Sequence, residues 1–309
     1  MIVPILSYGA EIWACFGWRK QNLAIIEQYL MNSKHIFEKL QSKMCKNALG
    51  IRKNVPDHAA KAEMGTYPIM GLLVKRIFSY WQHVLASPVN TILSRAFQLS
   101  VSLDRNDKVS YYTRLKSLLN FLDMRHQIYQ VPENQVKTYT NGIRNKFHTI
   151  FSVKYFRNMK MTGKTELYHQ IKKTYIFEKY LDTHLPPELK RNLTAIRISG
   201  HCLPIERLRR MGIERSKRYC NLCVENEIGC EQHVLIYCKN KELITLRKDF
   251  KTKLVELNKQ YQNFTMENIM KIQLLANDAS TSYYFAVFLK KVFNLVNVAY
   301  SNKDKYTTS

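Results

Sequence analysis

The chain has 309 residues, 46% of them hydrophobic, which is enough to bury a substantial core and excludes a wholly disordered protein. Lys and Arg number 48 against 24 acidic residues, so the formal net charge is +24. Half of this excess lies in residues 141–220, which carry 18 basic and 6 acidic side chains. Such a surplus makes nucleic acid the first partner to consider and an anionic membrane surface the second.

The apolar segments at the two ends of the chain bear on its compartment. The first, "MIVPILSYGAEIWACFGW", has no basic n-region and contains Glu11, so it predicts a buried helix and not a signal peptide. The second carries Lys290 and Lys291 at its centre, where a membrane span would incur a large desolvation penalty. Seven cysteines without a secretory signal favour reduced thiols. We expect a cytoplasmic or nuclear protein that is not secreted and has no membrane partner.

Helical periodicity dominates the chain. In "GLLVKRIFSYWQHVL", apolar side chains recur at Leu73, Ile77, Trp81 and Val84, which predicts an amphipathic helix. A short helix is expected between Pro56 and Gly65, and another after Pro187. Similar patterns predict helices at about 21–48, 110–122, 141–160, 240–258 and 279–300. The expected fold class is all-α, with one small irregular zinc-binding module.

Cysteine and histidine side chains cluster in "CNLCVENEIGCEQHVLIYC", residues 220–238. Cys220 and Cys223 form a C-x2-C pair, and His233 and Cys238 follow as H-x4-C, which together supply four ligands for a tetrahedral zinc ion. On an α-helix five residues turn through about 500°, so His233 and Cys238 cannot both face the ion from one regular helix. We predict that the helix holding His233 starts or ends within this interval, and that the chain bends before Cys238.

Other cysteines lie outside this set of four ligands, and the sequence leaves the role of one of them open. Cys230 could replace a cysteine ligand or be a spare thiol at the turn. Cys15 and Cys45 lie in apolar helical patterns and are expected to be buried. His201, with Cys202 beside it, has no partner at ligand spacing. A site with four protein ligands is closed, so we expect one structural Zn²⁺ that performs no chemistry.

A basic segment, "RLRRMGIERSKRYC", directly precedes and enters the cysteine cluster. Phosphate contacts are its expected use, which would make binding strongly salt-dependent. The candidate nucleic-acid-binding residues are Arg207, Arg209, Arg210, Arg215, Lys217 and Arg218. Four tyrosines could stack on unpaired bases, although tyrosines at helical spacing are more often core residues: Tyr168, Tyr175, Tyr219 and Tyr237.

Two blocks of sequence resemble a known family. "ILSYGAEIW" (5–13) and "KNALGIRKNVPDHAAKAEMGTYPIMGLLVKRIFSYW" (46–81) resemble the region after the palm in reverse transcriptases of LINE-type, non-LTR retrotransposons. "RISGHCLPIERLRRMGIERSKRYCNLCVENEIGCEQHVLIYC" (197–238) resembles their zinc-binding module. The resemblance implies zinc ligation by Cys220, Cys223, His233 and Cys238, and a grip on template RNA or target DNA. At Cys230 the family commonly has a polar or acidic residue.

The resemblance also implies an organisation in four segments. These are a thumb-like helical region (1–125), a basic helical connector (126–195), a CCHC zinc-binding module (196–240) and a C-terminal helical region (241–309). Polymerases of this family carry an Asp-Asp turn in the palm, and no Asp-Asp pair occurs in this sequence. The resemblance begins within five residues of Met1, so we expect a C-terminal portion that is not itself an enzyme.

Two other classes of function remain open. One is an enzyme with an unrecognised site, although the sequence has no HExxH, GxSxG, P-loop or dinucleotide-binding glycine pattern. The other is a structural module in which zinc staples helices that bind another protein, with no nucleic-acid role. Binding to RNA or DNA, and its salt dependence, would separate both classes from a nucleic-acid-binding protein.

Overall fold

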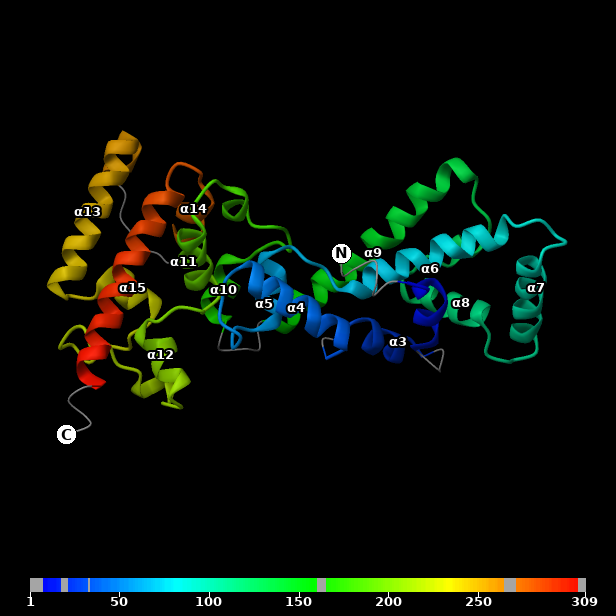
Figure 1. Ribbon diagram of the computed structural model, residues 1–309, viewed down its shortest axis with the longest axis horizontal. Coiled ribbons are helices and arrows are strands. Elements are labelled where there is room, and N and C mark those ends of the chain that lie inside the picture. The colour runs from blue at the N-terminus through cyan, green and yellow to red at the C-terminus, as the bar shows by residue number, and fades with distance from the viewer. Residues whose placement is uncertain (1–7, 18–21, 33, 160–164, 264–270, 305–309) are drawn as a thin grey trace. The chain divides into compact units, whose positions relative to one another are not determined.

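The computed structural model describes residues 8–17, 22–32, 34–159, 165–263 and 271–304 (Figure 1). In these residues the fold is helical, and β-type pairing is confined to two isolated bridges, Met64 with Phe177 and Tyr219 with Ile228. The expected all-α class is therefore confirmed. None of the described helices is long and apolar enough to cross a membrane.

The chain divides into two compact units. Unit 1 comprises Met1–Gln41 and Tyr67–Asn158, and unit 2 comprises Ser42–Thr66 and Met159–Ser309. Because each unit combines segments that are distant in sequence, the predicted division into four consecutive segments stays a prediction. The helices of unit 1 are α2 (Ala10–Trp13), α3 (Leu23–Leu30), α6 (Ile69–Leu85), α7 (Ile92–Arg105), α8 (Tyr111–Phe121) and nearly all of α9 (Glu133–Met159).

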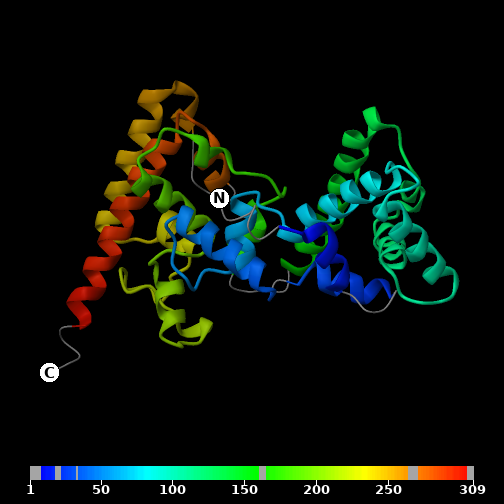
Figure 2. The same ribbon diagram turned by 45° about the vertical axis from the view of Figure 1, so that its right-hand side comes forward.

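Helix α4 (Ile36–Ala48) contains the boundary between the units. The helices of unit 2 are α5 (Asp57–Glu63), α10 (Glu166–Ile171), α11 (Pro187–Arg197), α12 (Pro204–Arg210), α13 (Lys241–Leu257), α14 (Lys271–Asn277) and α15 (Ser282–Asp304). The last of these packs against both α11 and α13, and α13 and α15 lie side by side in Figures 1 and 2. Phe250 of α13 stacks on Phe288 of α15 at 4.9 Å between ring centroids, which joins these two helices.

Unit 1 is built around α6, whose predicted apolar stripe is confirmed. Leu73, Ile77 and Trp81 are each 1% exposed. They belong to one apolar core that also takes in side chains of α2, α3, α8 and α9. The indole of Trp81 donates a hydrogen bond to the carbonyl of Ile128 at 2.9 Å, so its one polar atom is satisfied inside the core.

Several predicted boundaries differ from the structure. The helix expected at 21–48 is two helices, α3 and α4, because the side chain of Asn32 accepts a hydrogen bond from the Lys34 amide and turns the chain. Helix α9 begins at Glu133 and not near residue 141, and α7 was not predicted. The buried N-terminal helix is present in part, as α2 and a 3-10 turn at Ala14–Gly17, and residues 1–7 lie outside the described part of the chain.

The short helix predicted between Pro56 and Gly65 is confirmed as α5. Gly65 ends it in a left-handed conformation, with φ of +57°. A Cβ atom there would lie 2.3 Å from the backbone nitrogen of Phe177, so glycine is required for the chain around residue 177 to approach α5. That approach brings Glu63, at the end of α5, beside the side chains of a buried ion cluster described below.

Candidate metal centre and basic surface

Cys220 and Cys223 lie on a tight turn of the chain. The Cys220 amide donates to the carbonyl of Glu227 at 2.7 Å, and the Gly229 amide donates to the carbonyl of Arg218 at 2.9 Å. These bonds flank the isolated bridge between Tyr219 and Ile228. The resulting short hairpin presents the two thiols of the C-x2-C pair to one side, as that spacing predicts.

A π-helix, His233–Tyr237, carries His233, and Cys238 follows it directly. Its characteristic bond joins the Cys238 amide to the His233 carbonyl, five residues earlier, at 2.7 Å. Cys238 itself has left the helix, with φ of −55° and ψ of 127°. The helix that holds His233 ends at Tyr237, inside the interval in which the sequence predicts that it starts or ends. The wide turn explains how a five-residue spacing brings both side chains to one point.

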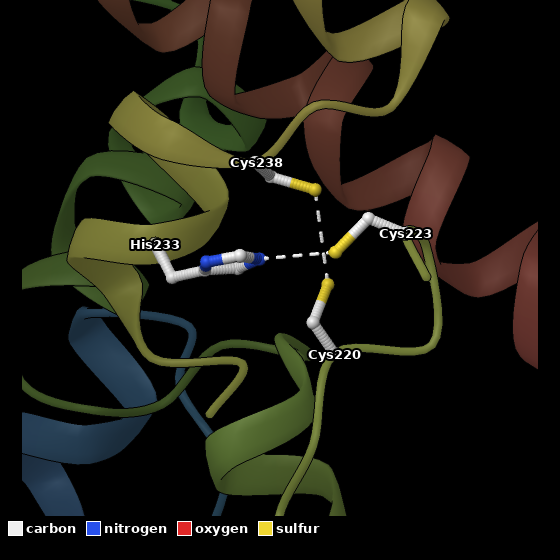
Figure 3. Close-up of side chains that lie close together, drawn as sticks. All are labelled: Cys220, Cys223, His233 and Cys238. Carbon is white, nitrogen blue, oxygen red and sulfur yellow. Dashed lines mark hydrogen bonds between the residues drawn. The ribbon is translucent and has the colours of Figure 1, made fainter. Parts of the chain in front are cut away.

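The four predicted ligands converge (Figure 3). Their ligand atoms all lie within 4.8 Å of one another. The Sγ atoms of Cys220 and Cys238 are 3.8 Å apart, and Cys223 Sγ lies 3.4 Å from His233 Nε2. A tetrahedral ion with ordinary Zn–S and Zn–N distances would separate two sulfurs by about 3.8 Å, and a sulfur and a nitrogen by about 3.6 Å. The cluster therefore has the composition and the size to hold one metal ion.

Hydrogen bonding between the thiols prepares the cluster for a cation. The bond to Cys238, followed by burial, raises the pKa of Cys220. The same bond, from the side of Cys238, lowers the pKa of Cys238 to about 5 against the effect of its burial. The hydrogen bond between the two sulfurs thus favours a thiol beside a thiolate, and the thiolate is the form that binds metal.

Two side chains donate hydrogen bonds to the backbone of the ligand segments. The guanidinium of Arg247, on α13, donates to the carbonyl of Cys238 and, at 3.4 Å, to that of Val234. Asn240 donates from Nδ2 to the carbonyl of Leu222 at 3.0 Å, while its Oδ1 caps α13. Sequence reasoning missed both residues, although an asparagine directly before a helical pattern is a recognisable cap signal.

The structure brings neither Cys230 nor His201 into the cluster of four. The thiol of Cys230 accepts the His233 amide at 3.4 Å, and burial raises its pKa. His201 is buried, and its Nε2 lies 2.9 Å from Glu231 Oε1 while its Nδ1 accepts the Leu203 amide. Nε2 therefore carries the ring proton and donates a hydrogen bond to the carboxylate. His201 thus ties the start of α12 to the segment before the π-helix.

Three of the six predicted basic residues are paired with the chain's own carboxylates. Arg209 donates twice to Glu206, at 2.9 and 2.6 Å. Arg215 lies 2.6 Å from Glu166 on α10. Lys217 lies 3.7 Å from Glu214. Their positive charge is therefore partly compensated within the fold.

The other three contact neutral groups. Arg207 lies over the ring of Tyr300 at 4.5 Å and reaches Asn297 Oδ1 at 3.5 Å. Arg210 donates to the carbonyl of His201 at 3.0 Å, and Arg218 donates to that of Ile213 at 2.8 Å. These contacts orient the guanidinium groups, and the charge of Glu206 acts on Arg210 and Arg218. We call these six residues, which lie on α12 and in the segment that follows it, the basic surface.

The four tyrosines considered for base stacking divide into two pairs. Tyr168 is fully buried and Tyr175 is 4% exposed, so both are core residues. Tyr219 and Tyr237 are 43% and 54% exposed, and they directly precede the ligands Cys220 and Cys238 in sequence. Only this second pair is accessible to a base. Cys15 and Cys45 are buried, as predicted.

A buried ion cluster in unit 2 was missed from the sequence. It joins Glu63, Lys172, Glu178 and Arg197, all at most 4% exposed. Arg197 Nε lies 2.5 Å from Glu63, and its Nη2 lies 3.0 Å from Glu178. Lys172 lies 2.5 Å from Glu178. Two cations thus meet two anions, so burial leaves no net charge.

Hydrogen bonds complete this cluster. Tyr180 donates to Glu63 at 2.7 Å, and Asn277 of α14 donates to Glu178 at 3.1 Å. Burial opposes ionisation of Glu178, but the charges of Arg197 and Lys172 outweigh it and lower its pKa. Burial lowers the pKa of Lys172, although both carboxylates counteract that effect. The cluster holds together segments from α5, α11, α14 and the chain between α10 and α11.

Comparison with protein-family models, with curated proteins and with solved structures found no match. The resemblance to LINE-type reverse transcriptases therefore stays a prediction.

Proposed function

We propose that this chain is a nucleic-acid-binding, zinc-containing portion of a LINE-type reverse transcriptase, and that it grips template RNA or target DNA. The observation that carries the proposal is the convergence of Cys220, Cys223, His233 and Cys238 directly after an arginine-rich segment. The resemblance of residues 5–13, 46–81 and 197–238 supplies the family.

Zinc fits the cluster better than other common ions. Three thiolates and one imidazole are soft ligands, whereas Mg²⁺ and Ca²⁺ prefer oxygen. With four protein ligands the coordination shell is closed, so the ion stabilises the fold and leaves no position for a catalytic water. We infer a binding role and not a catalytic one.

The basic surface would supply the contacts with nucleic acid. Arg207, Arg210 and Arg218 donate hydrogen bonds to neutral acceptors, which orient their guanidinium groups for contacts with phosphate groups. Tyr219 and Tyr237 are exposed nearby in sequence and could stack on unpaired bases. The metal would keep the hairpin and π-helix, and with them this surface, in one arrangement.

One observation favours a second candidate, a zinc-stapled module that binds protein and not nucleic acid. Arg209, Arg215 and Lys217 are each paired with a carboxylate of the chain itself. Such pairs weaken the attraction for phosphate, because the charge is already compensated. The six basic residues within the twelve positions from Arg207 to Arg218, directly before the ligand cluster, lead us to prefer the first candidate.

The test is fluorescence anisotropy with labelled single-stranded RNA and duplex DNA across a salt series. The wild-type chain is compared with Cys220→Ser/Cys238→Ser, and Cys230→Ser serves as the matched control because Cys230 lies in the same module but outside the cluster. Metal content is measured on each sample. We expect one zinc per chain in the wild type and in the control, and none in the double variant.

Steeply salt-dependent binding by the wild type and the control, lost in the double variant, would support the proposal. Zinc at one per chain with no binding at low salt would overturn the nucleic-acid role and favour the protein-binding module. Absence of zinc from the wild-type protein would overturn the metal assignment.

A further inference from the structure

A groove of about 210 Å³ lies in unit 2 outside the metal cluster. The turn after α4, helix α11 and helix α15 border it, and His201 and Cys202 lie on its wall. Positively charged and amide side chains dominate its polar lining: Arg52, Arg191, Asn192, Lys290, Asn294 and Asn297. None of these residues is among the six basic residues that the sequence singled out.

Two cations of the groove have no acidic partner. Arg52 and Arg191 are exposed, and among the residues that the structure describes neither guanidinium forms an ion pair or a side-chain hydrogen bond. Lys290 is paired with Glu188 at 2.9 Å. The balance of charge along the groove therefore remains positive. A free guanidinium presents two parallel donors, which suit a phosphate oxygen pair.

The groove adjoins the arginines of α12. Arg207 reaches Asn297, and Arg210 donates to the carbonyl of His201, so both touch residues that line the groove. Burial and then the charge of Arg52 lower the pKa of Arg210, which places these two like charges near each other. The charge of Glu206 also acts on Arg210, but like charges this close still favour an anionic ligand between or beside them.

A neutral donor in the groove is also without a partner. Asn192 Nδ2 is buried and has no hydrogen-bond acceptor among the described residues. An unsatisfied buried donor is costly, so a ligand oxygen that reaches it gains free energy. Gly50 provides room beside Arg191, because a Cβ atom there would lie 2.8 Å from Arg191 Nε.

We propose that this groove binds backbone phosphates of the nucleic acid through Arg52 and Arg191, with Asn192 as a neutral donor. The proposal rests on the proposed function and extends its basic surface from α12 to the side of α11 and α15. The nucleic acid would then contact two sets of cations that are separated in sequence, Arg52 and Arg191 on one hand and the α12 arginines on the other.

The test compares the intact chain with Arg52→Gln/Arg191→Gln, using a labelled 20-nucleotide RNA and a 20-base-pair DNA duplex. Arg95→Gln/Arg105→Gln is the matched control, because it removes the same charge from exposed positions of α7 in unit 1. Each lost phosphate contact should reduce the slope of log K against log salt by about 0.9 for duplex DNA and about 0.7 for RNA. We expect a slope lower by nearly 2 for the duplex and an affinity lower by roughly tenfold or more at 0.1 M salt.

A third variant, Asn192→Ala, separates hydrogen bonding from charge. It should weaken binding by a few fold and leave the salt slope unchanged, since a neutral donor displaces no counterion. If the wild-type chain binds, and Arg52→Gln/Arg191→Gln has the same salt slope and affinity as the control variant, the groove proposal is overturned. The proposed function would remain intact. Absence of binding by the wild-type chain would overturn the proposed function, and the groove proposal with it.

Discussion

The two units are stabilised by different means. Unit 1 encloses one apolar core centred on Trp81, in which the indole's single polar atom is bonded to a carbonyl. Unit 2 has apolar contacts as well, but two polar centres join its segments: the buried ion cluster around Arg197 and the four metal-ligand side chains. Apolar burial tolerates changes of metal and salt, whereas polar centres depend on every partner being present. The units should therefore respond differently to the same treatment.

Metal removal should give the largest difference. Binding free energy at structural zinc sites is of the order of 10 kcal/mol at neutral pH, and it contributes directly to folding. A chelator should therefore speed amide hydrogen exchange across the hairpin, the π-helix and α13, while α6 and α8 keep their protection. Equal loss of protection in both units, or in neither, would contradict the comparison. Cys230→Ser should keep the metal and the wild-type exchange pattern.

Arg197→Met should destabilise unit 2 by about 3–5 kcal/mol, because it leaves Glu63 buried without its cation and leaves Glu178 paired with Lys172 alone. Arg191→Met, on the same helix but exposed, should change stability by less than about 0.5 kcal/mol. Urea unfolding followed by exchange in α10 and α11 measures both. A neutral effect of Arg197→Met would show that the cluster does not hold the segments together.

Leu118→Ala should destabilise unit 1 by about 2–5 kcal/mol, since Leu118 is 1% exposed within the apolar core. Leu99→Ala is the control, because Leu99 is 62% exposed on α7. Exchange in α6 reports the loss. Adding a chelator should not increase it, and a clear increase would contradict independent stabilisation of the two units.

The smallest effect concerns pH in unit 1. Burial and then the charge of Arg144 lower the pKa of His148 to about 4, and its ring stacks on Tyr67 at 3.6 Å. Between about pH 6.5 and 4 the unfolded chain binds more protons than the folded one, so stability falls as the pH is lowered through that window. His148→Phe should reduce the loss of amide-exchange protection in α6 as the pH is lowered. An unchanged pH profile in this variant would contradict the assignment.

In unit 2 the corresponding acid sensitivity should begin lower. The pKa of Glu178 is depressed below its ordinary value of 4.5, so its contribution is present above that pH and is lost as the pH falls further. The contribution of Glu178 to stability is thus expected to change in a different pH range from that of His148. A pH titration that resolves exchange in α6 and in α11 would therefore show two separate transitions.

Periodicity predicted the helical class and most long helices, because the pattern of Leu73, Ile77 and Trp81 reflects burial directly. It missed α7, which is less apolar than α6 and carries Ile92 and Leu99 exposed. It also misplaced the end of α3, since Asn32 redirects the chain by a local hydrogen bond that has no periodic signature.

Spacing identified the four ligand side chains, because tetrahedral coordination restricts the distances along the chain. The ion cluster around Arg197 could not be predicted in this way. Lys172 and Glu178 are close in sequence, but Glu63 lies more than a hundred residues from both, and isolated charged residues are normally exposed. Likewise, nothing in the sequence distinguishes Arg218, held by a carbonyl, from Arg215, held by Glu166.

The π-helix makes the ligand set sensitive to chain length. Its turn closes on five residues, from the His233 carbonyl to the Cys238 amide, where an α-helical turn closes on four. Deletion of a single residue from this stretch would let an ordinary helix form and swing the last ligand by about 100°. Conservative substitutions at Val234 or Leu235 should be tolerated far better than any insertion or deletion. A module that holds its metal in this way should accordingly keep the five-residue interval even where the intervening side chains differ.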